Sequence, residues 1–507
     1  MSEQDILHKV IRNTVFNIIG RFWNVLITFF LTPYIIKHIG IERYGVFALV
    51  GVLTGYFGLL DLGVGYSFVK YIAEFYAKKD YNKINKVTNT GFAFYSIFAV
   101  IIIVLAFLNI KILLAIFKIP APLQKEVSFV FLLAVVIFGL LNVFSSFFAI
   151  QKGLQRLDVT NKIEIAISIP KFLGTIFFLK NGLGLPGLMI NNAIVFLIAS
   201  IINFAAVFKL LPQLKFNPFL SSWQTFKTLF GFGFKIQISR FAGLFHFQMD
   251  KFLLAYFLNV SLVAFYSIAS EVASRLMELP MMLITVIQPA ASELDAKSEK
   301  KGLVELYYRS MKYVVLLALP ATLLTILLAK PFISLWLGKG YEKAILTLQL
   351  LVIAYFINVL TGPGFCILNG IGKPEYAMRS SILAMVLNAL LSIILVIKIG
   401  YFGVVFGTIS ALTIAAIYFL FLFYKVSHIP FLNSLTQVFL KPLTLGLIPF
   451  LFGLMFINNF SQFNWLGLIT FSLLYLVLFF VLMLIVKYID NYDKDLLKKI
   501  VGLEIFK

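Results

Sequence analysis

The chain has 507 residues, of which 61% are hydrophobic and only 13% are charged, and its mean hydropathy is +0.97. Roughly 25% of the residues of an ordinary soluble domain are charged, so this composition excludes a soluble globular protein and predicts an all-α polytopic membrane protein. Membrane topology accounts for the net charge of +21, and no nucleic-acid partner is predicted.

Residues 1–12 are polar, and the first apolar segment has no small-residue cleavage site. We therefore expect this segment to remain as the first membrane span rather than to act as a cleaved signal peptide.

Fourteen apolar segments are long enough to cross about 30 Å of hydrocarbon as helices. Their apolar runs are continuous and lack the two-residue alternation of a membrane β-barrel, which favours helices. The predicted spans are residues 14–36, 44–67, 91–116, 127–150, 162–180, 184–208, 233–257, 262–289, 311–334, 345–368, 378–397, 401–424, 440–458 and 465–486.

Lys and Arg are concentrated in every second connection, counted from the N-terminal segment inward. Cytoplasmic connections carry an excess of basic residues, so this distribution predicts that both termini are cytoplasmic. The same residues could also attract anionic lipid headgroups.

One stretch near the N-terminus returns in the second half of the chain. Without a gap, Arg240 falls on Arg21, and ELDAK from Glu293 falls on EFYAK from Glu74. Downstream, FCILNGIGKPE falls on FAIQKGLQRLD at nearly the same offset. Shared Leu, Ile and Phe can produce such similarity by chance, but polar landmarks at a nearly constant offset favour an internal duplication.

The duplication predicts three parts of the chain. They are an N-terminal six-helix bundle at 1–215, its C-terminal copy at 216–432, and two further transmembrane helices with a cytoplasmic tail at 433–507. Because six is an even number, both bundles enter the membrane with the same orientation. Two parallel bundles around a central cavity suit alternating access, in which the bundles rock about a site near the midplane.

The segments RFWNVLITFFLTPYIIKHIGIERYGVFALV and LLDLGVGYSFVKYIAEFYAKKD resemble the start of the polysaccharide flippases. These are the O-antigen (Wzx-like) members of the multidrug/oligosaccharidyl-lipid/polysaccharide (MOP) exporter superfamily, which also contains the MATE exporters. The resemblance is most specific in the first two helices and the basic loop, and extends more loosely over the chain through the span count and the duplication.

The resemblance implies a transporter rather than an enzyme, with no cofactor. It would move an undecaprenyl-pyrophosphate-linked oligosaccharide from the inner to the outer leaflet of a bacterial or archaeal cytoplasmic membrane. The expected partners are this lipid-linked oligosaccharide, membrane lipids, a coupling ion such as H⁺ or Na⁺, and polysaccharide polymerase or assembly proteins.

Cations within the apolar spans are candidates for binding the pyrophosphate, because a charge at a helix centre costs roughly 2.5 to 3.5 kcal/mol unless it faces a cavity or a partner. Arg21 lies about 12 Å into the first span and could instead snorkel to the headgroups. Its repeat counterpart Arg240 shares one helical stripe with Lys251. Asp250 could carry a coupling ion, or could neutralise Lys251 as a structural ion pair.

The eighth predicted span carries Glu271, Arg275 and Glu278 on one helical face. Arg275 is a further candidate for the substrate headgroup, although the two acids could pair with it completely. If either carboxylate is left unpaired, burial would raise its pKa and make it a coupling-ion site. Asp61 beside glycines is another such candidate, or else a structural hydrogen-bond acceptor.

Other sequence features point away from different functions. The four histidines lack metal-ligand spacing, so no metal site is predicted. Asp493 and Asp495 form a DxD pattern in a charged tail, which we expect to be solvated. A MATE-like drug or cation antiporter, the alternative function, would more naturally have a carboxylate in its first helix, and none occurs between Asp5 and Glu42. A membrane polymerase or ligase would need large outer loops, and the predicted outer connections are short.

Overall fold

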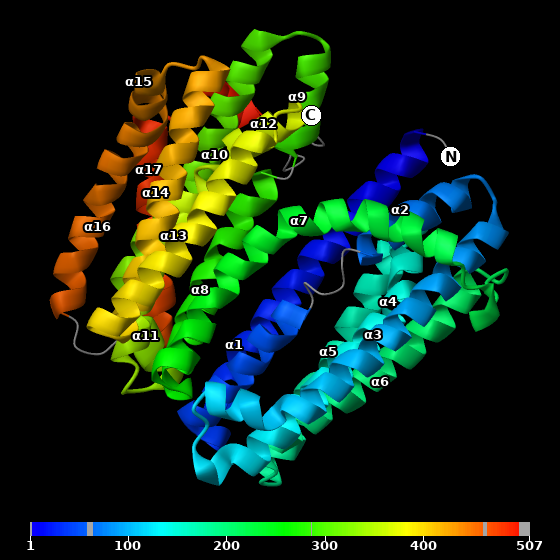
Figure 1. Cartoon of the computed structure of the whole chain (residues 1–507). Helices are drawn as coiled ribbons and strands as arrows, with labels where there is room; N and C mark the ends of the chain where they lie inside the picture. Colours follow the sequence, from blue (N-terminus) through cyan, green and yellow to red (C-terminus); the bar gives the residue numbers. More distant parts are fainter. Residues whose placement is uncertain (1–2, 58–63, 285, 460–463, 496–507) are drawn as a thin grey trace. The chain divides into compact units, whose positions relative to one another are not determined.

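The computed structural model describes residues 3–57, 64–284, 286–459 and 464–495. These residues form α-helices joined by short connections, and no β-strand occurs among them (Figure 1). The prediction of an all-α polytopic fold is confirmed. A helix satisfies its backbone hydrogen bonds internally, which is what an apolar segment in lipid requires.

Two compact units make up the chain, Met1–Ala264 and Phe265–Lys507. The first contains α1 (Glu3–Phe57), α2 (Val64–Ala77), α3 (Tyr81–Ile116), α4 (Gln124–Gly153), α5 (Leu157–Lys180), α6 (Gly184–Leu210) and α7 (Trp223–Leu253). Helix α8 (Val260–Ile284) begins in the first unit and continues in the second.

The second unit then contains α9 (Ile287–Ala296), α10 (Lys300–Leu337), α11 (Glu342–Val359), α12 (Gly362–Gly370), α13 (Glu375–Ile399), α14 (Tyr401–Ser427), α15 (Phe431–Ser434), a π-helix (Leu435–Leu440), α16 (Lys441–Asn459) and α17 (Trp465–Ile485). This division follows contacts within each unit, so the repeat boundary at 215/216 stays a prediction.

In the first unit, α4 packs against α2, α3 and α6, while α1 packs against both α5 and α7. The buried core between α2, α3 and α4 includes Phe68, Ile72, Tyr95, Phe147 and Ile150. Helix α1 lies outside this core and contacts both α5 and α7.

Helix α1 joins the first two predicted spans into one element. Its backbone bends at Gly40, where φ is 79° and ψ is 166°, a conformation that a residue with a Cβ adopts only with strain. The two spans are thus separated by a kink rather than by a loop.

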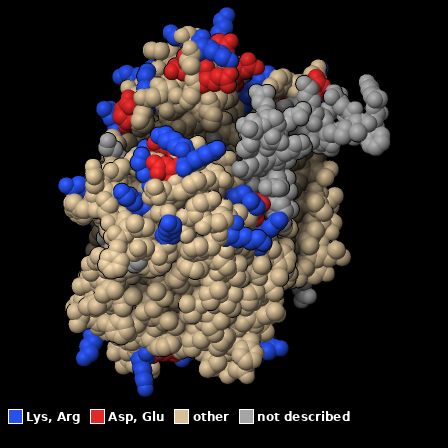
Figure 2. Space-filling view, turned by 90° about the vertical axis from the view of Figure 1, so that its right-hand side faces the viewer, with Lys and Arg blue, Asp and Glu red and all other residues tan. Residues whose placement is uncertain are grey.

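Eleven segments in the described part of the chain are long and apolar enough to cross a membrane. The number differs from fourteen because α1 counts once and α5 and α7 are not among the eleven. The number of membrane crossings therefore remains a prediction. Figure 2 shows charged side chains gathered in the upper part and at the lower edge of one face, with a broad uncharged band between them.

The duplication has structural counterparts in the two units. Glu74 pairs with Lys78 at the end of α2, and Glu293 pairs with Lys297 at the end of α9. The next residue has a positive φ in both cases, 55° at Lys79 and 56° at Ser298.

A second pair of equivalent contacts lies between helices. A Cβ on Gly153 would lie 3.3 Å from the backbone nitrogen of Ala73, and a Cβ on Gly370 would lie 3.2 Å from that of Ser292. In each unit the glycine allows close contact between two helices. They are α4 and α2 in the first unit, and α12 and α9, their counterparts in the predicted repeat, in the second. These matched features support the duplication.

The second unit contains a close helix pair, α13 and α14. A Cβ on Gly403 would clash with the Leu395 carbonyl, and one on Gly407 would clash with Ser392. Gly403 and Gly407, which are spaced as in a GxxxG motif, therefore let α13 and α14 pack closely, as small residues at membrane helix interfaces commonly do.

The expectation of a solvated tail at Asp493 is wrong. This side chain is only 4% exposed and accepts hydrogen bonds from Tyr313 Oη at 2.7 Å and from the Lys312 ammonium. Both partners lie on α10, which the sequence places 180 residues away. The lysines that made the segment look solvated gave no sign of this distant pairing.

In the first unit, two buried asparagines of α3 hold the connection between α6 and α7. Asn89 donates to the carbonyl oxygens of Asn85 and Lys215, each at 2.8 Å, and accepts from the Asn217 backbone N–H at 2.9 Å. Asn85 accepts from the Lys215 N–H at 2.8 Å. These part-buried bonds give the backbone of the connection polar partners on α3.

We expect Asn89→Ala to destabilise the protein by about 1 to 3 kcal/mol, because it removes the bonds that the buried Asn89 side chain makes to the part-buried backbone of the connection. Thermal unfolding in detergent, followed by tryptophan fluorescence, measures the change. Asn109→Ala is the matched control, since Asn109 is exposed and bonds only to its own helix at Leu105. Equal melting temperatures of the two variants would contradict the structural role of Asn89.

Candidate functional site

Helix α8 brings three of the predicted site residues into direct contact. The Arg275 guanidinium donates to Glu271 Oε1 at 2.9 Å and to Glu278 Oε1 at 2.7 Å. The spacings of four and three residues place all three side chains on one helical face. Both acids engage the one arginine, as the paired interpretation predicts.

Two more predicted site residues lie in the last turn of α7. Asp250 is 2% exposed, Lys251 is partly buried, and neither side chain lacks an interaction partner. The neighbouring Phe252 ring contacts Phe117 edge-on at 5.6 Å, and Lys118 donates to the Phe257 carbonyl at 3.1 Å. This end of α7 is therefore fixed against the end of α3.

Arg21 and Arg240 lie in α1 and α7, two helices that contact each other. Their side chains, and the whole of Asp61, lie outside the described residues. The roles predicted for these three residues stay predictions.

A polar contact that the sequence did not predict joins α1 to α5. Two residues after Arg21, Trp23 Nε1 donates to Ser168 Oγ at 2.6 Å. One turn further along α5, the Lys171 carbonyl accepts from the buried Asn191 at 3.0 Å. The sequence feature that could have drawn attention to this part of α5 is Lys171, a cation in an apolar segment beside Pro170.

The first unit thus has cations on three helices, Arg21 on α1, Lys171 on α5 and Arg240 on α7, and α1 contacts both of the others. Basic residues on neighbouring membrane helices can bind an anionic group, whose charge offsets the cost of burying them. Among the described residues, no group of three or more His, Cys, Asp or Glu side chains could hold a metal ion.

Two solved transporter structures share this fold over most of the chain. The lipid II flippase MurJ, in an inward closed conformation, matches with a TM-score of 0.68 and 17% identity, covering 96% of this chain and 100% of that one. An inward-facing multidrug-resistance MATE transporter of the MOP superfamily matches with a TM-score of 0.67 and 15% identity, covering 79% of this chain and 94% of that one. The chain has the fold of the MOP transporters.

Residues 39–346 match the family described as polysaccharide biosynthesis protein. This match covers more than half of the chain, and the chain belongs to that family. A Shigella flexneri protein whose name assigns it to O-antigen transport is 23% identical over 373 residues, which are 72% of this chain and 86% of that protein. The resemblance to polysaccharide transporters of the MOP superfamily is confirmed.

The arrangement on α8 generates a prediction about membrane insertion. Glu271→Gln or Glu278→Gln alone leaves Arg275 with one acid, so we expect near-normal abundance of each single variant. The double variant leaves an unpaired cation in an apolar helix, at a cost of roughly 2.5 to 3.5 kcal/mol, and its abundance in the membrane should fall. Quantitative blotting of membrane fractions measures this effect.

Adding Arg275→Gln to the double variant is the control. It removes the unpaired charge, so the neutral triple variant should recover normal abundance. A triple variant that stays as scarce as the double variant would show that charge pairing is not what the acids contribute.

Proposed function

We propose that this protein is a flippase that moves an undecaprenyl-pyrophosphate-linked oligosaccharide from the cytoplasmic to the outer leaflet of the cytoplasmic membrane. The observation that carries the proposal is the match of nearly the whole chain, 96%, to the fold of a lipid flippase. At 17% identity, this structural similarity shows the fold alone. The family, polysaccharide biosynthesis, supports a glycan as the cargo.

Alternating access follows from the same architecture. Each unit has its own packed helices, so each could move as a body while its internal contacts persist. Rocking of two such repeats would expose a central site first to one side of the membrane and then to the other. H⁺ or Na⁺ would couple to this cycle at Asp61, Asp250, Glu271 or Glu278.

The pyrophosphate is proposed to bind Arg21 and Arg240, with Lys251 and Arg275 as further cations near the path. The contact between α1 and α7 supports the pairing of the two arginines. A guanidinium presents a planar fork that holds two phosphate oxygens at once, whereas an ammonium acts as a point charge. Arg275 already engages two carboxylates, so Arg21 and Arg240 are the principal ligands in this proposal.

We expect Arg21→Ala and Arg240→Ala each to weaken substrate binding by about one to two decades, since a charged hydrogen bond is worth roughly 1.5 to 3 kcal/mol. Arg→Lys at either position keeps the charge but loses the fork, so export should be partly defective. Surface glycan in a complemented deletion strain is measured beside protein abundance.

Arg379→Ala is the matched control, because Arg379 is an exposed arginine that lies over the ring of Tyr376 on α13. Its surface glycan should equal that of the wild type. Wild-type glycan from both Arg21→Ala and Arg240→Ala would rule out the proposed pyrophosphate site.

The proposed orientation has both termini in the cytoplasm. It rests on the distribution of Lys and Arg. Two contacts in the first unit agree with the predicted alternation of sides, because Arg43 bonds to Glu126 at 3.0 Å and Asn85 bonds to the Gln213 carbonyl at 3.2 Å, and each contact joins two connections predicted to share a side. Cys366, the one cysteine of the sequence, is first replaced by Ser. Single cysteines introduced at Asn82 and at Ser298 should then both react with thiol reagents only from the cytoplasmic side. Labelling of only one of the two from outside would contradict the parallel repeat, and labelling of both from outside would contradict the proposed orientation.

The alternative function is a MATE-like drug or cation antiporter, since a multidrug MATE transporter shares the fold. The glycan assay separates the two, because deletion of an antiporter would change drug susceptibility and leave surface glycan intact.

A further inference from the structure

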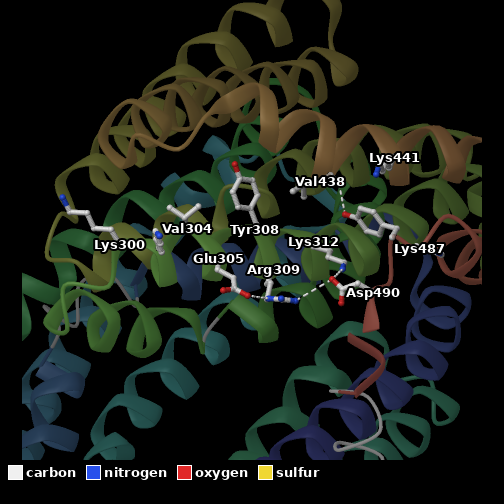
Figure 3. Close-up of a pocket in the computed structure, with 12 residues that line it drawn as sticks. Lys300, Val304, Glu305, Tyr308, Arg309, Lys312, Val438, Lys441, Lys487 and Asp490 are labelled. Atoms are coloured by element: carbon white, nitrogen blue, oxygen red, sulfur yellow. Dashed lines mark hydrogen bonds and ion pairs between the residues drawn. The ribbon is translucent and has the colours of Figure 1, made fainter. Parts of the chain in front are cut away.

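A basic pocket of about 780 Å³ lies in the second unit, where the start of α10, the start of α16 and the segment after α17 come together (Figure 3). Its volume is within the range of about 300 to 1,000 Å³ that is common for small-molecule sites. Six cations line it: Lys300, Lys301, Arg309, Lys312, Lys441 and Lys487. Two acids, Glu305 and Asp490, face them.

Acidic side chains neutralise one wall of the pocket. Arg309 donates to Glu305 at 2.8 Å, and Lys312 donates to Asp490 at 3.2 Å (Figure 3). Burial alone would raise the pKa of Asp490, but the backbone N–H of Asp493 and the Lys312 ammonium outweigh it and hold the pKa below its usual range. Asp490 is therefore ionised at neutral pH and pairs with Lys312.

The other four lysines have no ion pair to an acid among the described residues: Lys300, Lys301, Lys441 and Lys487. The positive charge of the pocket is thus in excess where these side chains lie. Tyr488 Oη donates to the Val438 carbonyl at 2.8 Å, which fastens the segment of Lys487 to the π-helix directly before α16. This bond holds the backbone that carries Lys487 close to the one that carries Lys441.

The pocket lies at the ends of three candidate membrane spans, Lys300–Leu337, Val438–Ile457 and Trp465–Ile485. Exposed apolar side chains adjoin Lys441 and Lys487 along the chain. They are Leu440, Leu443, Ile485 and Val486, with exposures of 41%, 40%, 69% and 43%. Lysines therefore adjoin exposed apolar surface at the ends of candidate membrane spans, and basic pockets between membrane helices are suited to anionic headgroups.

We infer that this pocket binds the phosphate of a lipid headgroup, with Lys441 and Lys487 as its principal ligands and the acyl or prenyl chain against the adjoining apolar surface of α16 and α17. Two lipids could supply this chemistry, an anionic phospholipid or the pyrophosphate-bearing carrier lipid. The inference does not depend on the cargo or direction of transport, because it concerns binding alone.

The test compares lipid binding by the full-length protein in detergent, measured by native mass spectrometry or thermophoresis. The probes are phosphatidylglycerol, zwitterionic phosphatidylcholine and undecaprenyl pyrophosphate. The double variant Lys441→Ala/Lys487→Ala should bind the anionic probes at least about tenfold more weakly than the wild type, from two lost charged contacts. Lys441→Arg/Lys487→Arg keeps both charges and should retain binding.

Lys339→Ala/Lys398→Ala is the matched control, since it removes two exposed lysines of the same unit that do not line the pocket. This variant should bind all probes like the wild type. A selective loss of phosphatidylglycerol identifies a phospholipid as the source, and a selective loss of undecaprenyl pyrophosphate identifies the carrier lipid. Wild-type binding by the alanine pocket variant, or an equal loss in the control, would overturn the inference.

Discussion

The cost of placing a charge in hydrocarbon governs the charged residues of this protein. A cation on an apolar helix needs a carboxylate, a polar cavity or a bound anion, because water is absent there. Arg275 meets the requirement with two acids on its own helix. Lys312 meets it with Asp490 and Asp493. The lysines at Lys441 and Lys487 have no such acid among the described residues, and this contrast separates structural charges from candidate ligand sites.

Close helix packing inside each unit is a second feature of the structure, separate from the charged residues. Backbone contact at Gly153 and Gly370 recurs at equivalent places in the two units, and Asn85 and Asn89 fix the connection that follows α6. Movement between repeats requires that such internal contacts persist while only the surfaces between bodies change. Each of these contacts lies within one unit.

The fold does not by itself select the cargo. Flippases and multidrug exporters share this architecture, because a scaffold of packed helices leaves the choice of substrate to a few side chains. A transporter of organic cations needs a carboxylate to receive its cargo, whereas a carrier of lipid-linked pyrophosphate needs cations. The helices α1, α5 and α7 carry Arg21, Lys171 and Arg240, and this chemistry accords with the proposed anionic cargo.

The sequence by itself determined the all-α membrane class, the family resemblance, and the single-face spacing of Glu271, Arg275 and Glu278. These depend on local composition, apolar run length and helical periodicity, which a linear sequence records directly. Only the tertiary structure decided that Arg275 engages both acids, that Trp23 meets Ser168, and that Asp493 is buried against α10. Each of these depends on side-chain geometry or on packing of residues far apart in the chain, and neither leaves a local sequence pattern.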